Sequence, residues 1–368
     1  MRLLRRGAAR RRPGRLTLAR IALDAMGGDF APRATVAGAL LAVRELDQAH
    51  SVLLVGRTAV IEKELAELLA TPEFADVAGQ RGRLPIVEAP DVIEMSDKPT
   101  VALKASKANS SMVVGLRLQT EGRADAFVSA GNTGAQMAAS TVLLKLHGAI
   151  KRPAIASVFP TARQPVVVLD AGANVDCSAE ELVDFARLGS VYAEDILGRD
   201  NPCVGLLSIG EEAEKGNAVV KEANGLLAAA GLNFQGNVEG RDLPKGESDR
   251  GPFDVVVCDG FVGNVMLKFY ESLAPVLLEM VASSANVDRK TLLSAFKHLD
   301  YSEHGGAPLL GVRGVSIISH GKSSPVAVKN AIRVALRAVE SRMTDHIGRR
   351  LAAESAGADG AGPVQGAA

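Results

Sequence analysis

The sequence predicts an α/β fold built on a mostly parallel sheet with helices on both faces. Short runs rich in Val, Ile and Leu alternate with longer amphipathic segments along the 368 residues, and this alternation is typical of parallel strands joined by crossover helices. Four of the apolar runs end in a turn that combines Gly with Asp or Asn. The carboxyl ends of parallel strands meet at one edge of a sheet, where open α/β folds bind ligands.

The four turns share one pattern, in which an apolar run is followed by small polar residues and then by a helical segment. They are LDAMGGD at 23–29, SAGNTG at 129–134, LDAGAN at 169–174 and CDGFVGN at 258–264. Any one of them is explained equally well as a left-handed turn or a helix N-cap, because Gly and Asn serve both purposes. Four together favour a shared cleft.

Each expected strand is a run of β-branched and other apolar residues bounded by turn-forming residues. The expected strands cover 17–23, 51–55, 84–87, 126–128, 153–159, 166–169, 204–209, 233–236, 253–259 and 315–319. The short linker TARQP at 161–165 predicts that the strands on either side of it are neighbours. The segments at 89–99 and 238–251 are expected to be irregular.

The expected helices show apolar residues at a spacing of three or four. They cover 32–47, 59–69, 100–120, 134–146, 179–196, 218–230, a segment from the turn at 260–264 to about 282, 289–299 and 325–351. Ile61, Leu65 and Leu68 predict the buried face of the second helix. Ser178 is an expected N-cap, and Ser324 caps the last helix with Pro325 at its first position.

The composition is that of a soluble globular protein, with 47% hydrophobic and 23% charged residues. The three cysteines, Cys177, Cys203 and Cys258, form no C-x-x-C pattern. This favours a reducing compartment, and hence a cytoplasmic location, over a disulfide or zinc framework. No apolar run reaches ~18 residues, so no membrane-spanning helix is expected.

The charge pattern separates a basic arm from an acidic body. Residues 1–20 hold eight Arg and no acidic residue, which leaves 34 basic against 42 acidic residues in 21–368. We expect 1–16 to be a disordered arm, 17–351 to be one α/β catalytic unit of two intertwined subdomains, and 352–368 to be a disordered tail. The arm is either an extension without a role, including a start codon set too far upstream, or a segment attracted to anionic lipid or an acidic protein.

Several catalytic motifs are absent from the sequence. It has no G-x-x-x-x-G-K-[ST] loop, no G-x-G-x-x-G after the first strand and no G-x-S-x-G elbow, which argues against P-loop, dinucleotide and serine acyl-enzyme chemistry. None of the six histidines has Asp five positions later, and none shows metal-binding spacing. What remains is Gly, Asn, Asp, Ser and Lys, which position reactants and stabilise oxyanions.

Three helix starts offer backbone N–H groups to an anion. They lie at 131–134, at 263–265 and in SHGKSSP at 319–325. His320 ends the last strand, although a lone His at such a place also serves as a hydrogen-bonded structural residue.

Six longer segments follow one another in the sequence. They are IALDAMGGDFAP (21–32), VSAGNTGA (128–135), VVLDAGANVDC (167–177), LLSIGEEAEKGN (206–217), VVCDGFVGNVMLK (256–268) and GGAPLLGVRG (305–314). In that order and wording they resemble the phosphate acyltransferase family of bacterial phospholipid synthesis. The resemblance extends from about 17 to 347, nearly the whole expected fold.

The resemblance implies transfer of a long-chain fatty acyl group from acyl-acyl carrier protein to inorganic phosphate. The acyl phosphate would feed a membrane glycerol-3-phosphate acyltransferase, with which contact is expected. The resemblance also implies a fold similar to phosphate acetyltransferases and isocitrate or isopropylmalate dehydrogenases. It further implies a homodimer, no metal, no other cofactor and peripheral association with the inner face of the membrane; nucleic acid is not an expected partner.

Acyl transfer to phosphate requires that an anion be held, that a tetrahedral oxyanion be stabilised and that a thiolate leave. We expect the turns at 131–134 and 259–264 to face each other across the cleft, with Asn132, Thr133 and Asn264 on phosphate or the carbonyl oxygen. The candidate catalytic residues are Asn132, Asn264 and Lys268, the last offsetting charge. The candidate substrate- and phosphate-binding residues are Asp24, Gly27, Gly28, Gly131, Thr133, Gly134, Asp170, Asn174, Asp259, Gly263 and His320. The carboxylates would orient Lys side chains or N–H groups, because a bare carboxylate repels phosphate.

The segment 265–304 is shorter than in longer relatives of the family, in which a protruding helical hairpin touches the membrane. Leu292, Leu293 and Phe296 give this hairpin an apolar edge. They are expected either to contact the membrane or to pack against a dimer partner. The Arg-rich arm also precedes the point at which the family's first strand starts.

Two other functions remain open. A soluble phosphate acetyl- or butyryltransferase would release coenzyme A instead of the carrier thiol. A non-catalytic scaffold would bind the carrier and the membrane acyltransferase without phosphate-dependent turnover. Docking of an acidic carrier on this acidic body requires a local basic patch, for which the candidates are Lys151, Arg152, Arg163, Lys290 and Lys297.

Overall fold

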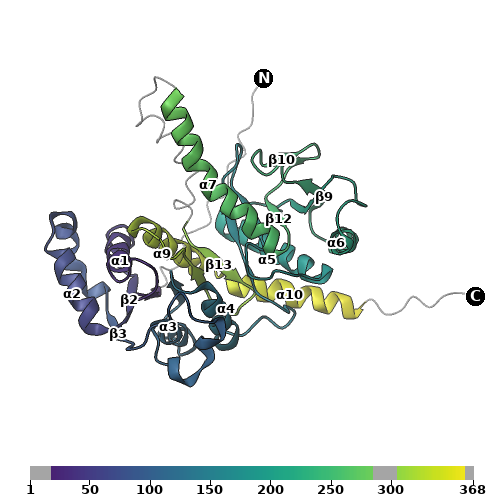
Figure 1. Cartoon of the computed structure of the whole chain (residues 1–368). Coiled ribbons are helices and arrows are strands. Elements are labelled where there is room, and N and C mark those ends of the chain that lie inside the picture. The colour runs from purple at the N-terminus through teal and green to yellow at the C-terminus, as the bar shows by residue number, and fades with distance from the viewer. Residues whose placement is uncertain (1–17, 285–304, 361–368) are drawn as a thin grey trace, which may run out of the picture.

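The computed structural model describes residues 18–284 and 305–360. Strands and helices alternate along the chain, and most of the strands form two sheets (Figure 1). Most neighbouring strands are parallel, and helices cover both faces. This confirms the predicted α/β fold.

The first sheet has seven strands in the order β3-β2-β1-β4-β14-β13-β5. They are β1 (Arg20–Asp24), β2 (Ser51–Gly56), β3 (Ile86–Glu88), β4 (Ala126–Ser129), β5 (Ala154–Ile155), β13 (Ala307–Leu310) and β14 (Ser316–Ile318). The strands from β3 to β14 are parallel, whereas β13 is antiparallel to both of its neighbours. The sequence pattern missed β13, whose GGAPLLG segment begins with two turn-forming glycines.

The second sheet has five strands in the order β6-β7-β12-β8-β9. They are β6 (Ser157–Phe159), β7 (Val166–Leu169), β8 (Val204–Ser208), β9 (Phe234–Glu239) and β12 (Val255–Val257). Only β6 is antiparallel to its neighbour, and its pairing with β7 confirms the adjacency predicted from the short linker. A small hairpin of β10 (Glu247–Ser248) and β11 (Gly251–Pro252) lies in the loop that was expected to be irregular.

Helices connect the strands and cover the sheets. They are α1 (Arg33–Glu45), α2 (Thr58–Leu69), α3 (Ser111–Thr120), α4 (Thr133–Leu143), α5 (Ala179–Leu197), α6 (Ala218–Ala229), α7 (Gly260–Ser284), α9 (Pro325–Glu340) and α10 (Met343–Gly360), with 3-10 segments η1 (Pro72–Arg83), η2 (Pro99–Leu103) and η3 (Ala105–Lys107). In β1, Ile21 and Leu23 pack on the face covered by α1 and α9, and Ala22 packs on the face covered by α3 and α4. Burial on both faces explains why the strand is apolar throughout.

In the second sheet, α5 and α7 lie on opposite faces. Leu206, Val255 and Val257 belong to the apolar cluster that contains α5, whereas Val256 and Cys258 pack on the side of α7. Because β12 is inserted between β7 and β8, the helices that follow β7 and β12 leave the sheet in different directions. Such divergence opens a crevice at the carboxyl ends of the strands.

Two of the predicted helices differ from the structure, and a third is untested. α3 begins at Ser111 rather than near 100, because Ser110 caps it by accepting from the N–H of Val113 and residues 99–107 form short 3-10 turns. The last predicted helix is two helices, since Arg342 has a φ of 54° and interrupts it; the second ends at Gly360 rather than near 351. The helix predicted at 289–299 lies outside the described residues.

Other local predictions are confirmed. Ile61, Leu65 and Leu68 are the buried residues of α2. Ser178 caps α5 in a capping box with Glu181, and Ser324 caps α9.

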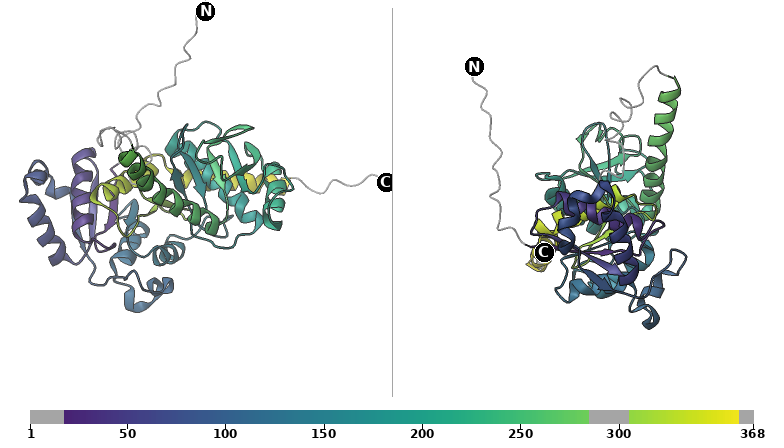
Figure 2. Two further views of the ribbon diagram at one scale, coloured as in Figure 1. Left: turned by 45° about the horizontal axis from the view of Figure 1, so that its top comes forward. Right: turned by 90° about the vertical axis from the view of Figure 1, so that its left-hand side faces the viewer.

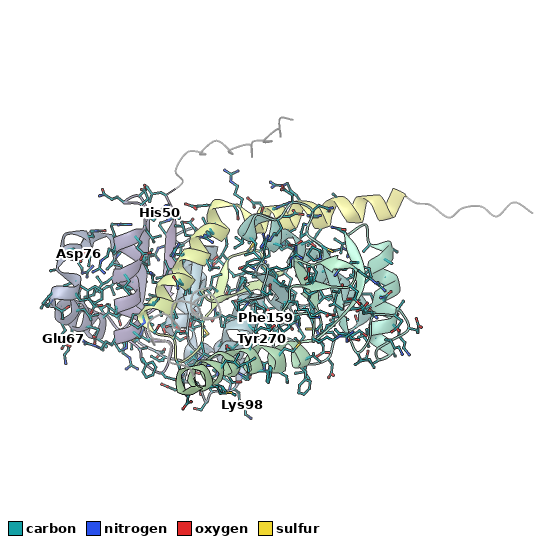
Figure 3. The ribbon with its side chains drawn as sticks, turned by 90° about the horizontal axis from the view of Figure 1, so that it is seen from above. His50, Glu67, Asp76, Lys98, Phe159 and Tyr270 are labelled. Atoms are coloured by element: carbon teal, nitrogen blue, oxygen red, sulfur yellow. The ribbon has the colours of Figure 1, made fainter. Side chains whose placement is uncertain are left out.

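The long helix α7 extends away from the body, as Figure 1 and the right view of Figure 2 show. Its base is anchored on the second sheet by Tyr270, whose ring centroid lies 4.8 Å from that of Phe159 in β6 (Figure 3). Four apolar residues four or seven positions apart, Phe261, Val265, Phe269 and Val276, are exposed along one side. None of the helices in the described part of the chain combines the length and apolar character needed to cross a membrane.

Candidate functional site

The turns after β1, β4 and β14 pack together at one edge of the first sheet. A β-carbon on Gly27 would lie 2.9 Å from the backbone nitrogen of Gly131, so only glycine permits this approach. Gly28 has a φ of 109°, and the N–H of Asp29 donates a 2.7 Å hydrogen bond to the carbonyl of Gly321. Three of the predicted segments are therefore brought together.

Asp24 is buried beneath these turns, with 2% of its surface exposed. Its Oδ2 accepts a 2.7 Å hydrogen bond from Ser129 Oγ, and its Oδ1 accepts one of 3.2 Å from the N–H of Met26. Burial raises the pKa of the Asp24 carboxyl, and hydrogen bonds, among them those from Ser111 and Ser129, oppose this rise. Asp24 thus joins the turn after β1 to the turn after β4.

Asn132 has a partner for each polar group of its side chain. Its Oδ1 accepts a 3.0 Å hydrogen bond from the N–H of Ala135 and so caps α4. Its Nδ2 donates to the carbonyls of Glu94, Met95 and Asp97 at 3.3, 3.1 and 2.8 Å. The side chain is 8% exposed. These contacts tether the irregular segment 94–97 to the start of α4, and they leave the predicted contact with phosphate untested.

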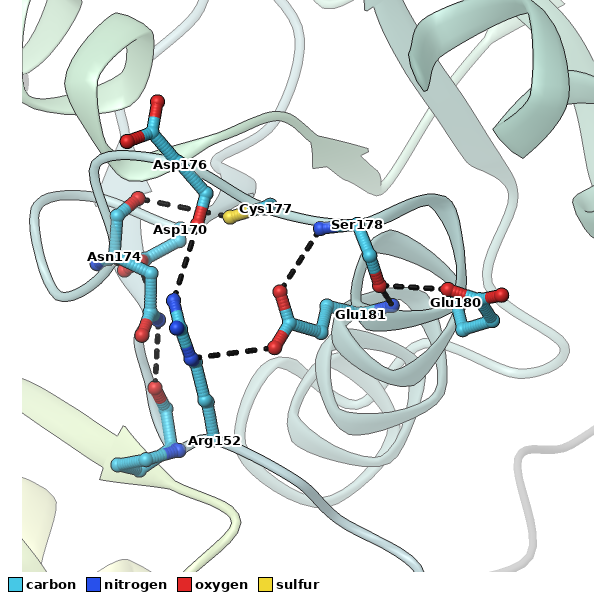
Figure 4. Close-up of polar contacts among 9 residues, drawn as sticks. Arg152, Asp170, Asn174, Asp176, Cys177, Ser178, Glu180 and Glu181 are labelled. Carbon is cyan, nitrogen blue, oxygen red and sulfur yellow. Dashed lines mark hydrogen bonds and ion pairs between the residues drawn. The ribbon is translucent and has the colours of Figure 1, made fainter.

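Asp170 organises the turn after β7. Its Oδ1 accepts hydrogen bonds of 3.0–3.2 Å from the N–H groups of Ile155, Gly172 and Ala173. Its Oδ2 accepts from the backbone and side-chain nitrogens of Asn174 at 2.6 and 2.9 Å (Figure 4). Burial raises the pKa of Asp170 despite these hydrogen bonds. Of the two roles expected for the carboxylates, the orientation of N–H groups is the one that the geometry shows.

The turn after β12 rests directly on the turn after β7. A β-carbon on Gly263 would overlap the carbonyl oxygen of Asp170, and the N–H of Gly260 donates a 2.7 Å hydrogen bond to the carbonyl of Asn174. Asp259 Oδ1 accepts from the N–H of Val262 at 2.8 Å and shapes the start of α7. The half-buried Asn264 lies against Gly172, where a β-carbon would be 3.4 Å from its Cβ.

The four predicted turns therefore form two groups, one at each sheet. Between the described residues, no hydrogen bond joins 131–134 to 259–264, so the predicted facing of these turns stays a prediction. The groups are linked through α4. Asn132 caps this helix, and its Ala135 and Ala139 share an apolar cluster with Ala171 of the turn after β7.

A cavity of about 750 Å³ opens at the carboxyl ends of β8 and β12. Nine of its seventeen lining residues are Val, Leu, Ile or Met, and only Asp176 and Asp259 are charged. Its volume falls within the range of small-molecule binding sites. Ser208 lines the cavity, and its buried Oγ has no hydrogen-bond partner among the described groups.

Two cysteines line this cavity, and both are kept protonated. Burial raises the pKa of Cys177 to about 12 and that of Cys258 well above its ordinary value. Their Sγ atoms lie 3.6 Å from the carbonyl of Asn174 and 3.7 Å from that of Asp170. A thiol that stays protonated at neutral pH is a poor nucleophile, which argues against an acyl-cysteine intermediate.

A smaller pocket of about 180 Å³ lies at the start of α9. Ser319, which is 7% exposed, has an Oγ without a hydrogen-bond partner in the described structure and lines this pocket with His320 and Lys322. His320 is exposed and its Nδ1 accepts a 3.1 Å hydrogen bond from the N–H of Lys322. A helix start, a free hydroxyl and a lysine together suit a small anion.

The remaining predicted residues are less constrained. Thr133 and Lys268 are exposed, and Gly134 packs on Pro99, with 2.7 Å between a β-carbon at 134 and Cγ of the proline. The predicted membrane-contact residues Leu292, Leu293 and Phe296 lie outside the described residues. Histidine, cysteine and acidic side chains form no cluster of three or more suited to a metal ion within 18–284 and 305–360.

The predicted basic patch is partly engaged in internal contacts. Arg152 pairs with Glu181 at 3.3 Å and donates to the carbonyl of Asp176 (Figure 4). Arg163 forms an ion pair with Glu247, while Lys151 is exposed. Lys290 and Lys297 lie outside the described residues.

Sequence reasoning missed the cavity and its walls. Val219 and Val220 are ordinary apolar positions of an amphipathic helix, and no local pattern distinguishes a cavity wall from a core contact. The one usable signal was the family-like segment 206–217, which contains Leu206, Ser208 and Ile209 of the cavity, but no residue in it was singled out.

The chain is similar to known proteins over most of its length. The model of a family described as "Fatty acid synthesis protein" matches residues 19–346. A phosphate acyltransferase of Heliobacterium modesticaldum is 49% identical over 331 residues, covering 87% of this chain and 94% of that protein. One of Moorella thermoacetica is 46% identical over 339 residues, covering 89% and 95%.

Solved structures show the same fold at low sequence identity. A phosphotransacetylase from Streptococcus pyogenes superposes with a TM-score of 0.58 at 15% identity, covering 89% of this chain and 94% of that one. The EutD phosphotransacetylase from Staphylococcus aureus gives a TM-score of 0.55 at 15% identity, covering 87% and 94%. The expected likeness to the phosphate acetyltransferase fold is confirmed. From the extent and identity of these matches, the chain belongs to the phosphate acyltransferase family.

Proposed function

We propose that this protein transfers a long-chain fatty acyl group from acyl-acyl carrier protein to inorganic phosphate. The product, acyl phosphate, would serve glycerol-3-phosphate acylation in phospholipid synthesis. The observation that carries the proposal is an apolar cavity of about 750 Å³ beside the polar turn that starts at Asp259. An acyl thioester needs both features, because its chain is apolar and its carbonyl becomes an oxyanion during transfer. The named relatives support the same reaction.

In the proposed reaction, a phosphate oxygen attacks the thioester carbonyl carbon and forms a C–O bond. The tetrahedral oxyanion then collapses, the C–S bond breaks and the electron pair leaves with the carrier thiolate, which takes a proton from water. The protonated thiols of Cys177 and Cys258 support direct attack by phosphate rather than a two-step transfer through the enzyme. A thiolate is a good leaving group, so no strong general acid is required.

We assign the oxyanion to the start of α7. The side-chain amide of Asn264 would donate to the developing negative charge, and one such preorganised donor is worth ~3 kcal/mol. Lys268 lies one helical turn after Asn264, so it would offset charge from the exposed side of the helix. Asp170, Asn174, Asp259 and Gly263 hold this turn in shape rather than touching phosphate.

Phosphate would be held from the side of the first sheet. One candidate phosphate site is formed by Ser319, whose Oγ has no hydrogen-bond partner in the described structure, with His320 and Lys322. Another is formed by Thr133 and the N–H groups of the first turn of α4. The turns at that edge would be held together by the close packing of Gly27, Gly28 and Gly131 and by the hydrogen bond to Asp24. Asn132 acts in this proposal by positioning the start of α4 and the segment 94–97.

The cellular setting is also a proposal. A cytoplasmic homodimer that associates peripherally with the inner face of the membrane, and there meets the glycerol-3-phosphate acyltransferase, would place acyl phosphate near its next use. The exposed stripe Phe261, Val265, Phe269 and Val276 on α7 supports a second copy or a lipid surface as its cover.

The test is thiol release from palmitoyl-acyl carrier protein by the purified protein, with palmitoyl-coenzyme A as the parallel substrate. The proposal expects release from the carrier only when phosphate is present, together with a product that hydroxylamine traps. Preference for coenzyme A would instead identify a phosphotransacylase of the acetyl or butyryl type. Carrier binding without release would identify a scaffold.

A further inference from the structure

The apolar residues that line the cavity at the ends of β8 and β12 are buried at its floor and exposed at its rim. Its floor is formed by Leu182, Leu206 and Cys258, which are at most 5% exposed. The rim carries Val175 and Ile209, which are 64% and 83% exposed although they are large and apolar. Exposed apolar residues around an apolar cavity indicate a surface that an apolar ligand covers.

The cavity has two distinct walls. On one side stand Val262 and Met266 of α7, next to Asp259 at the end of β12. On the other side stand Val219 and Val220 in the first turn of α6. The charged Asp259 therefore lies at the α7 side, whereas the α6 side presents Val219 and Val220 beyond the capping residue Asn217.

We propose that this cavity holds the acyl chain, with the thioester at Asp259 and the methyl end against α6, so that Val219 and Val220 set the longest chain accepted. The inference rests on the proposed function and names the part of the substrate that the cavity binds. It explains the scarcity of charge in the lining, since two carboxylates among seventeen residues suit a hydrocarbon rather than a nucleotide or a sugar.

The close packing of Val220 in the α6 wall makes the proposal testable. Val220 is half-buried and already touches the glycine turn before α6, where a β-carbon on Gly216 would lie 2.6 Å from its Cγ1. A larger side chain at 220 has little room to turn away and must project into the cavity. Each methylene that is shut out of an apolar site costs roughly fourfold in binding.

The experiment compares acyl-carrier substrates of eight, twelve and sixteen carbons in the wild type, Val220→Phe and Val220→Ala. Val220→Phe is expected to lower kcat/KM for the sixteen-carbon substrate by about 15- to 60-fold, the cost of excluding two or three methylenes, while turnover of the eight-carbon substrate is kept. Val220→Ala is expected to shift the preference toward longer chains. Leu226→Phe, on the exposed side of the same helix, is the matched control and should leave the profile unchanged.

A second variant and a binding measurement keep the proposal testable if Val220→Phe misfolds or loses activity. Met266→Trp narrows the cavity from the α7 wall and should also disfavour long chains. Binding of cis-parinaric acid, a fluorescent long-chain fatty acid, should weaken in Val220→Phe but not in Leu226→Phe, whether or not the protein turns over. An unchanged chain-length profile and unchanged binding in active, folded Val220→Phe and Met266→Trp would overturn the cavity assignment. Absence of phosphate-dependent transfer in the wild type with every chain length would instead overturn the proposed function.

Discussion

Gly263, the fourth residue of α7, lies against the carbonyl oxygen of Asp170 so closely that a β-carbon at 263 would overlap it. This contact joins the turns after β7 and β12, which are 93 residues apart in the sequence. It fixes the start of α7, and with it Asn264, relative to the hydrogen-bonded turn 170–174.

The first prediction concerns this contact. Gly263→Ala should destabilise the protein by at least about 2 kcal/mol, because the methyl group must displace backbone rather than a flexible side chain. Gly225→Ala, in exposed α6 with nothing within 4 Å of its β-carbon, should be neutral or stabilising by about 0.5–1 kcal/mol. Urea unfolding of both variants measures the difference, and equal stability of the two would contradict the packing described.

The second prediction concerns the oxyanion donor. Asn264→Ala should lower kcat by about 10²- to 10³-fold with little change in KM, because the interaction forms mainly in the transition state. Lys268→Ala should cost less, since its ammonium is exposed and screened by solvent. Asn109→Ala, at another exposed position, serves as the control. Wild-type turnover by a folded Asn264→Ala would remove this residue from the site.

The third prediction separates two roles of Asn132, the capping of α4 and the tethering of residues 94–97. Asn132→Asp keeps an oxygen that can cap α4 but loses the amide that donates to the carbonyls of Glu94, Met95 and Asp97. It should therefore loosen residues 94–97 as much as Asn132→Ala does, with faster hydrogen exchange there, while α4 stays protected. Protected residues 94–97 in Asn132→Asp would show that the tether is unimportant.

The fourth prediction follows from the raised pKa of Asp24, whose ordinary value is 3.8. Between 3.8 and the raised value the native state holds a proton that the unfolded state has lost, so the free energy of unfolding falls as pH rises through this window. Asp24→Asn removes this titration. The stability of the wild type relative to Asp24→Asn should thus be greater near pH 4 than near pH 7 in urea unfolding. A difference that stays constant or grows with pH would contradict it.

The fifth prediction concerns the exposed stripe of α7. Phe269→Glu places a charge in its centre, between Val265 and Val276. If a second copy covers the stripe, this variant should be monomeric in sedimentation equilibrium at concentrations where the wild type is dimeric. If lipid covers it, the oligomeric state should be unchanged and flotation with anionic liposomes should fall. No change in either measurement would leave the stripe without a binding role.

The sequence was sufficient for much of the fold because the informative signals were local. The apolar spacing of Ile61, Leu65 and Leu68 depends only on helix geometry, and Ser178 with Glu181 forms a capping box within four residues. The strand-end turns were recognised for a similar reason, since Gly and Asp after an apolar run mark the edge of a parallel sheet.

Other features depend on contacts that no local pattern encodes. α3 was predicted too long because 100–110 keeps a helical spacing of apolar residues, yet Ser110 offers a better cap. The pairing of the turns was also beyond the sequence: the segment 131–134 packs with the turn after β1, and 259–264 with the turn after β7, because strand order places them there. The cavity depends on the exposure of side chains from α5, β8, α6, α7 and the turns between elements, which only the folded chain defines.

The most direct test is a single measurement of carrier thiol release from palmitoyl-acyl carrier protein by the wild type and by Asn264→Ala, each with and without inorganic phosphate. We expect release by the wild type to require phosphate and to match acyl phosphate formed one for one, with a loss of about 10²-fold or more in Asn264→Ala. Phosphate-independent release, or none, would contradict acyl transfer to phosphate at the turn that Asp170 and Gly263 hold together.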